Sequence, residues 1–148
     1  MNIIMKKEMD SKGKSLSKPA LITGISLIVM TFLSFIIFPS LQASTYHIVG
    51  ISIIIVLDII VAISLYYLLK PVNKNLSIIM SSIRIIYAII FAVALFNISD
   101  LVVFNSIWKI GLLIFGLHIL LLGILAYKSK YLPKWIGILL FIGAFGYI

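Results

Sequence analysis

The chain has 148 residues, of which 63% are hydrophobic and only 11% are charged, and its formal net charge is +8. A soluble globular domain is closer to half apolar and a quarter charged, and a domain of this size cannot hide such an excess in one core. With a mean hydropathy of +1.26, most of the chain is expected to be solvated by lipid. The absence of cysteine excludes disulfides, thiolate metal sites and cysteine nucleophiles.

The chain begins with a polar, basic segment, residues 1–18, which we expect to be a loosely ordered cytoplasmic tail. Residues 19–148 are expected to form one transmembrane domain of the all-α class, an integral membrane bundle of about five helices. Most of the apolar stretches approach the roughly 20 residues that cross a bilayer core, and they are too long and too continuously apolar for strands. The expected helices span residues 20–38, 46–69, 76–97, 107–127 and 133–148.

The first helix has an alternative interpretation as a cleaved signal peptide. Leu41-Gln42-Ala43 loosely fits a cleavage site. The apolar stretch and the tail before it are both long for a signal peptide, however. We therefore expect the first helix to remain in the membrane.

The lysines indicate the orientation. The tail and the connections 70–75 and 128–134 carry every lysine except Lys109. Positive charge marks the cytoplasmic side of multi-pass proteins, so these segments are expected to be cytoplasmic in a cell-membrane protein, and five helices would put the C-terminus outside. Interaction with anionic lipid headgroups explains the net positive charge better than interaction with nucleic acid does.

Three ionisable residues interrupt the apolar stretches: Asp58, Arg84 and His118. The rise of a helix puts each of them roughly 12–17 Å from the lysine-rich end, so they could meet in one layer. A charge in hydrocarbon is costly, and such residues usually pair and mark a site. The supporting polar residues at helical spacings around Arg84 are Ser77, Ser81 and Tyr87.

Two interpretations of this layer stay open. In the structural one, Asp58 and Arg84 form an ion pair that fixes helix packing, and His118 completes the network by hydrogen bonds. In the functional one, the layer lines a small cavity where His118 and Asp58 handle protons or bind a polar group, since histidine ordinarily titrates near neutrality. His47 lies roughly 16 Å from His118 by the same rise. We therefore expect no shared metal, no haem and no other cofactor.

Two stretches carry a family resemblance. One is the Pro71-x-Asn73-Lys74 turn followed by Arg84, and the other is Gly116-x-His118 followed by a Leu-Pro turn at 132–133. From about residue 46 onward, the chain resembles the bacterial multi-pass membrane family called domain of unknown function 4386. The resemblance implies an integral membrane protein and brings no activity. The three layer residues fall where family members carry the like residue. The connection 98–106 is shorter than in other members, which also usually continue into a further helix.

The expected function follows from what is present and what is missing. No phosphate-binding loop, zinc-binding motif, dinucleotide fingerprint or nucleophile elbow occurs, so no catalytic residue is assigned and an enzyme is the least favoured class. We expect a small non-enzymatic accessory or interaction protein. The alternative is a transporter-like or proton-linked protein that uses the buried layer. Beyond the lipid bilayer, the expected partner is a second copy or another membrane protein, bound through an exposed face of the fifth helix that contains Gly137 and Ala144.

Overall fold

The computed structural model describes the backbone of residues 3–130 and 132–147 and the side chains of residues 16–39, 41–130 and 132–147. The described backbone is helical apart from short connections and contains no strand, which confirms the all-α fold class. Its elements are α1 (Ile3–Ile37), the 3₁₀ helix η1 (Phe38–Ser40), α2 (Thr45–Leu69), α3 (Lys74–Phe96), α4 (Leu101–Lys128) and α5 (Lys134–Ala144).

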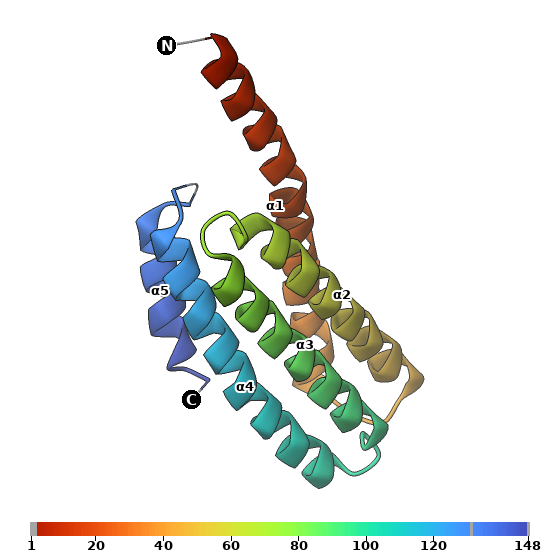
Figure 1. The fold of residues 1–148 in the computed structure, drawn as a ribbon. Helices are drawn as coiled ribbons and strands as arrows, with labels where there is room; N and C mark the ends of the chain where they lie inside the picture. The colour runs from red at the N-terminus through yellow and green to blue at the C-terminus, as the bar shows by residue number, and fades with distance from the viewer. Residues whose placement is uncertain (1–2, 131, 148) are drawn as a thin grey trace.

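Helix α1 begins earlier than expected. It starts at Ile3, so the backbone of the segment expected to be a loosely ordered tail is helical. Extending an existing helix is much easier than nucleating one, and the apolar stretch that follows supplies the nucleus. The first part of α1 consequently extends past the end of the bundle (Figure 1). The part long and apolar enough to cross a membrane is Leu16–Ile37.

Helix α4 also begins earlier than the expected residue 107. The side chain of Asp100 accepts hydrogen bonds from the backbone N–H groups of Val102 and Val103, at 3.0 and 3.2 Å. These bonds satisfy amide groups that have no partner inside the first turn of a helix. The cap explains why α4 starts at Leu101.

The helices pack in sequence order. α1 packs on α2, α2 on α3, α3 on α4 and α4 on α5, each running opposite to its neighbour (Figure 1). Among the described residues, α1 and α4 make no comparable contact with each other. The flank of the bundle between α1 and α4 is therefore left without close helix packing.

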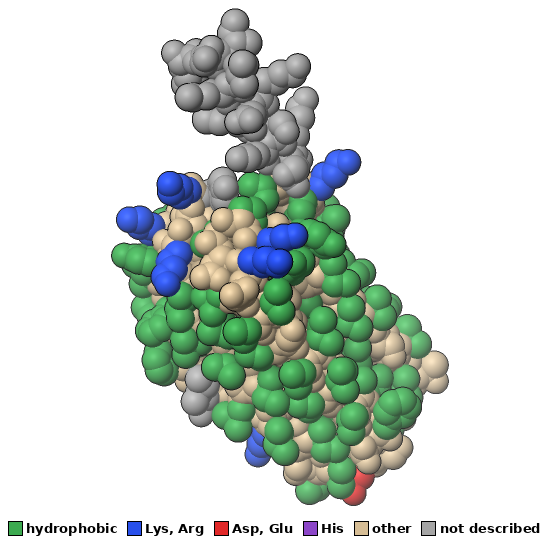
Figure 2. Space-filling model, in the orientation of Figure 1, with side chains coloured by type: hydrophobic (Ala, Val, Ile, Leu, Met, Phe, Trp, Pro, Cys, Tyr) green, Lys and Arg blue, Asp and Glu red, His purple; other side chains and the backbone are tan. Residues whose placement is uncertain are grey.

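The surface of the bundle matches a bilayer. Among the described residues, four helices are long and apolar enough to cross a membrane. Aliphatic side chains in their middle turns, such as Val56, Ile89 and Ile110, are more than half exposed. Figure 2 shows hydrophobic side chains along the flank and most of the lysines at the end of the bundle from which α1 projects. This arrangement fits an α-helical membrane bundle, because lipid solvates the flank and water the charged end.

Helix α5 is shorter than the expected span 133–148. Its eleven residues rise about 16 Å, roughly half of a hydrocarbon core about 30 Å thick. After α5, the ring of Tyr147 lies 5.2 Å from the ring of Phe115 in the middle of α4. By its own length α5 does not cross the membrane, and an outside C-terminus stays a prediction.

The orientation can be tested with single cysteines, because the chain has no native cysteine. In intact cells, Gln42→Cys in the connection after η1 is expected to react with a membrane-impermeant maleimide. Lys130→Cys, at the lysine-rich end, is expected to react only after permeabilisation. The cysteine-free parent is the control for background labelling. Labelling of Lys130→Cys alone in intact cells would reverse the orientation.

Candidate functional site

Asp58, Arg84 and His118 come from α2, α3 and α4, and the structure brings their side chains together. Nη2 of Arg84 donates a hydrogen bond to Oδ1 of Asp58 at 2.6 Å. Nη1 of Arg84 lies 3.1 Å from Nε2 of His118. All three residues are at most 1% exposed. Arg84 therefore links three helices, as expected from residues at a common level along the helices.

The partners of His118 define its tautomer. The Arg84 guanidinium has only donors, so Nε2 of His118 must accept its hydrogen bond. Nδ1 lies 3.0 Å from the carbonyl oxygen of Met80, which only accepts, so Nδ1 carries the proton. Both ring nitrogens are engaged by protein groups. His118 thus acts here as a neutral connector between α3 and α4.

The supporting residues on α3 divide into two groups. Ser77 and Ser81 are buried towards the lysine-rich end, and their Oγ atoms have no hydrogen-bond partner among the described residues. They do not join the Arg84 network. Tyr87 lies on the other side of Arg84, where its ring is 4.8 Å from the ring of Phe115. Of the three, only Tyr87 lines the cavity described next.

A cavity of about 760 Å³ lies against this network. Its base is formed by α2 and α3 and its two walls by α1 and α4, and we call it the α1–α4 groove. Asp58 and Arg84 are at one end of its base. The other residues that line it are Leu27, Met30, Thr31, Ser34, Phe35, Phe38, Pro39, Ile54, Tyr87, Phe91, Trp108, Leu112, Phe115, Ile119 and Tyr147. The lining is thus mostly aliphatic and aromatic, with one buried ion pair.

One end of the α1–α4 groove is covered by packed side chains. At the end away from the lysines, the rings of Phe38 and Trp108 stack across it, with centroids 4.8 Å apart and planes 9° apart. At the Arg84 end, Met30 and Ile119 each pack against the core cluster around Leu65, and Leu27 lines the groove beyond Met30. The open side is the flank where α1 and α4 do not pack together. The groove therefore has an opening on the apolar flank of the bundle.

Sequence reasoning left open a small cavity at the layer, but it did not predict the extent of this groove or its aromatic lining. One signal was available on α4, where Trp108, Leu112, Phe115 and Ile119 follow each other at intervals of four, three and four residues. Residues at these intervals share one face of a helix. The spacing alone does not tell a lipid-facing stripe from the wall of a cavity.

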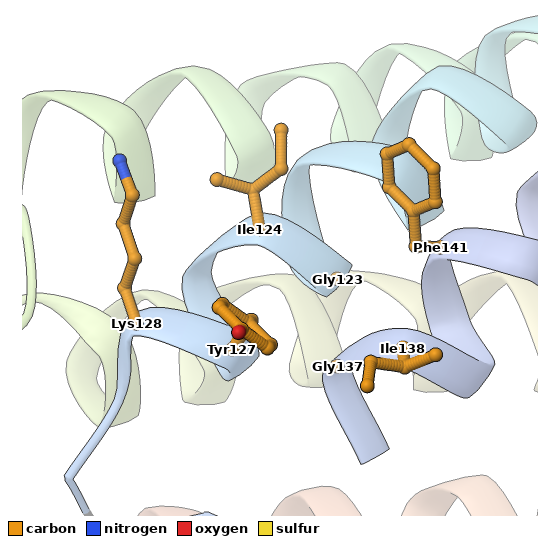
Figure 3. Close-up of a pocket in the computed structure, with 7 residues that line it drawn as sticks. All are labelled: Gly123, Ile124, Tyr127, Lys128, Gly137, Ile138 and Phe141. Carbon is orange, nitrogen blue, oxygen red and sulfur yellow. The ribbon is translucent and has the colours of Figure 1, made fainter. Parts of the chain in front are cut away.

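A second, smaller pocket of about 230 Å³ lies beside the crossing of α4 and α5 (Figure 3). Gly123 of α4 and Gly137 of α5 meet there. A Cβ on Gly137 would lie 2.6 Å from the backbone nitrogen of Tyr127, and one on Gly123 would lie 2.9 Å from that of Phe141. The expectation that Gly137 and Ala144 form an exposed face was therefore wrong, since both are buried. Their small size lets α5 approach α4 of the same chain.

The second histidine is not part of the network. His47 is buried near the start of α2, where its Nδ1 lies 2.6 Å from Oγ of Ser44. Within residues 16–39, 41–130 and 132–147, no group of three or more His, Cys, Asp or Glu side chains could hold a metal ion. The ion pair and the groove are thus the chemical features that these residues offer.

The comparisons place the chain in a family. The family model "Domain of unknown function (DUF4386)" matches residues 40–105 and 98–148. An uncharacterized protein of Archaeoglobus fulgidus is 52% identical over 119 residues, which cover 80% of this chain and 74% of that protein. No solved structure matches the chain significantly. A bacterial source, which the resemblance implied, stays a prediction. The chain belongs to the family of the domain of unknown function 4386.

Proposed function

We propose that the protein is a non-enzymatic binding protein of the cell membrane, with a cytoplasmic N-terminus, which holds a small apolar or amphiphilic molecule in the α1–α4 groove. The observation that carries this proposal is the groove itself. Sites for small molecules typically enclose about 300–1,000 Å³ and combine an apolar, aromatic lining with a few placed polar groups. A volume of about 760 Å³ with Asp58 and Arg84 at one end of the base has that character.

The groove supports binding better than it supports transport. A transport path must reach the water on each side of the membrane in turn, whereas the stacked rings of Phe38 and Trp108 cover one end of this groove. The contacts of His118 also oppose a proton-linked role, because Arg84 and Met80 already engage both ring nitrogens. If Nε2 of His118 took up a proton, the ring would become a cation with two donors. It would then face the Arg84 guanidinium, which is also a cation with donors only.

The proposal is tested with a diazirine amino acid at one of two adjacent positions in α4. Leu112 lines the groove, whereas Leu113 is 49% exposed and is not part of the lining. After illumination in native membranes, mass spectrometry of the protein with the diazirine at 112 is expected to give one dominant small-molecule adduct. The diazirine at 113 is the matched control and should capture the mixture of bulk phospholipids.

The same experiment separates the proposal from its alternatives. Identical phospholipid mixtures at the two positions would mean that the groove is ordinary lipid-facing surface, and the proposal would fail. A crosslink from position 112 to a second polypeptide would support the accessory or interaction role instead. If that polypeptide is another copy of this chain, the groove is the interface of a homo-oligomer.

A further inference from the structure

We infer that the molecule held in the α1–α4 groove is a neutral single-chain amphiphile, whose uncharged, hydrogen-bonding head lies at Asp58 and Arg84 and whose tail points towards Trp108. This inference rests on the proposed function and names its ligand class. Three features of the groove carry it: the balance of charge at its base, its open side and its length.

The charges at the base of the groove already cancel. Arg84 contributes one positive charge and Asp58 one negative charge, joined at 2.6 Å, and His118 is neutral in the tautomer that its contacts require. A charged head would leave one charge without a counter-ion in a low-dielectric site. Nε of Arg84 has no hydrogen-bond partner among the described residues, but it is buried and is not a donor that the groove exposes. The balance of charge therefore favours a head that carries no charge.

The open side of the groove also favours a ligand without a charge. The stack of Phe38 on Trp108 covers one end, and the flank between α1 and α4 is open because these helices do not pack together. A ligand from the bilayer then enters sideways between α1 and α4, at the depth of the hydrocarbon core. A permanent charge is costly at that depth, whereas a hydroxyl or an ester carbonyl crosses it far more readily.

The length of the groove fits one extended chain. On α4 the lining runs from Trp108 to Ile119, and on α1 and the start of η1 it runs from Leu27 to Phe38. Each span rises about 16 Å. An extended dodecyl chain has about this length. Ile119 is adjacent to His118, the partner of Arg84, so a head at the ion pair places the end of the tail near the indole of Trp108.

The chain contains two tryptophans, so Trp135→Phe leaves Trp108 as the only indole in the full-length protein. In phosphatidylcholine nanodiscs this variant is titrated with three dodecyl probes that carry bromine, a fluorescence quencher, at the tail end. The heads are a neutral alcohol, a trimethylammonium and a sulfonate. The alcohol is expected to quench Trp108 saturably, at a bilayer mole fraction roughly tenfold or more below that of either charged probe.

Three controls separate groove binding from partition into the bilayer. The converse variant, Trp108→Phe, keeps Trp135, which is 60% exposed, and it should report only non-saturable quenching by bulk probe. Ser34→Phe fills the groove and should abolish saturable quenching. Ile36→Phe, on the same helix but 57% exposed and not part of the lining, should not. Moving the bromine beside the hydroxyl should also remove the quenching, because the head is expected at Arg84.

The outcomes distinguish the ligand class from the binding role. All three probes could quench Trp108 saturably and equally, with the quenching abolished by Ser34→Phe. That result would overturn the inference of a neutral head and leave the proposed function standing. A preference for the sulfonate or the ammonium would overturn the inference in the same way. If no probe quenches Trp108 beyond the level seen for Trp135, both the inference and the proposed function fail.

Discussion

Truncation of Arg84 to alanine is expected to lower the free energy of unfolding by about 3–5 kcal/mol, because it leaves a buried carboxylate without its ion-pair partner. The Arg84 side chain also bonds His118, so Nε2 of that ring loses its donor as well. Asp58→Ala is expected to cause a comparable loss, since it leaves the guanidinium as an uncompensated buried charge. The measurements are the unfolding midpoint in mixed detergent micelles and the amount of folded protein in membranes.

The double substitution isolates the contact itself. Asp58→Ala combined with Arg84→Ala is expected to cost clearly less than the sum of the two single changes, because neither charge is left alone. Ser77→Ala is a matched control in α3. Its hydroxyl is buried without a hydrogen-bond partner among the described residues, so its removal should be close to neutral. Strictly additive losses from the pair would contradict the 2.6 Å contact.

Arg84 has two roles in this structure, and they cannot be separated by replacing it. It joins α2, α3 and α4 through Asp58 and His118, and it also lines the α1–α4 groove. A variant at Arg84 that loses ligand binding would therefore be uninformative if it also unfolds. The binding tests use Ser34 and Leu112 for this reason, since both line the groove and neither belongs to the ion-pair network.

The common level of the ion-pair layer could be predicted from the sequence because the level along a helix axis depends on one coordinate. The lysine-rich ends of α2, α3 and α4 give the helices a common origin, and a fixed rise per residue then places Asp58, Arg84 and His118 at one level. A buried charge needs a partner, so residues at one level in a small bundle can be expected to meet. The hydrogen bonds of Arg84 to the other two agree with that reasoning.

The α1–α4 groove could not be predicted because it depends on how the helices are arranged around the bundle axis. The stretch of α1 within the membrane buries a face that includes Thr23, Ser26 and Ile37, but these residues do not identify the helix on which that face packs. Only the structure places α1 on α2 and away from α4. The gap between α1 and α4 then turns Trp108 and Phe115, which an apolar helix could equally present to lipid, into the wall of a cavity.

The partner of α5 was misjudged for a related reason. Small residues such as Gly137 predict that some helix approaches closely, but they do not identify that helix. A neighbour in the same chain has the advantage that a short connection already holds it nearby, and only residues 129–133 separate α4 from α5. A homo-oligomer stays a prediction, and its interface has to lie elsewhere than the buried Gly137.

Gly137→Ala is expected to separate α5 from α4, because the added methyl group would lie 2.6 Å from the backbone nitrogen and 2.8 Å from the Cα atom of Tyr127, and backbone atoms cannot move aside without shifting a helix (Figure 3). Overpacking of this kind costs about 1–3 kcal/mol. Gly143→Ala in the same helix is the matched control, since a Cβ there meets no heavy atom within 4 Å. The measurement is the unfolding midpoint in mixed micelles. Equal midpoints for the two variants would mean that α5 does not pack on α4 through Gly137.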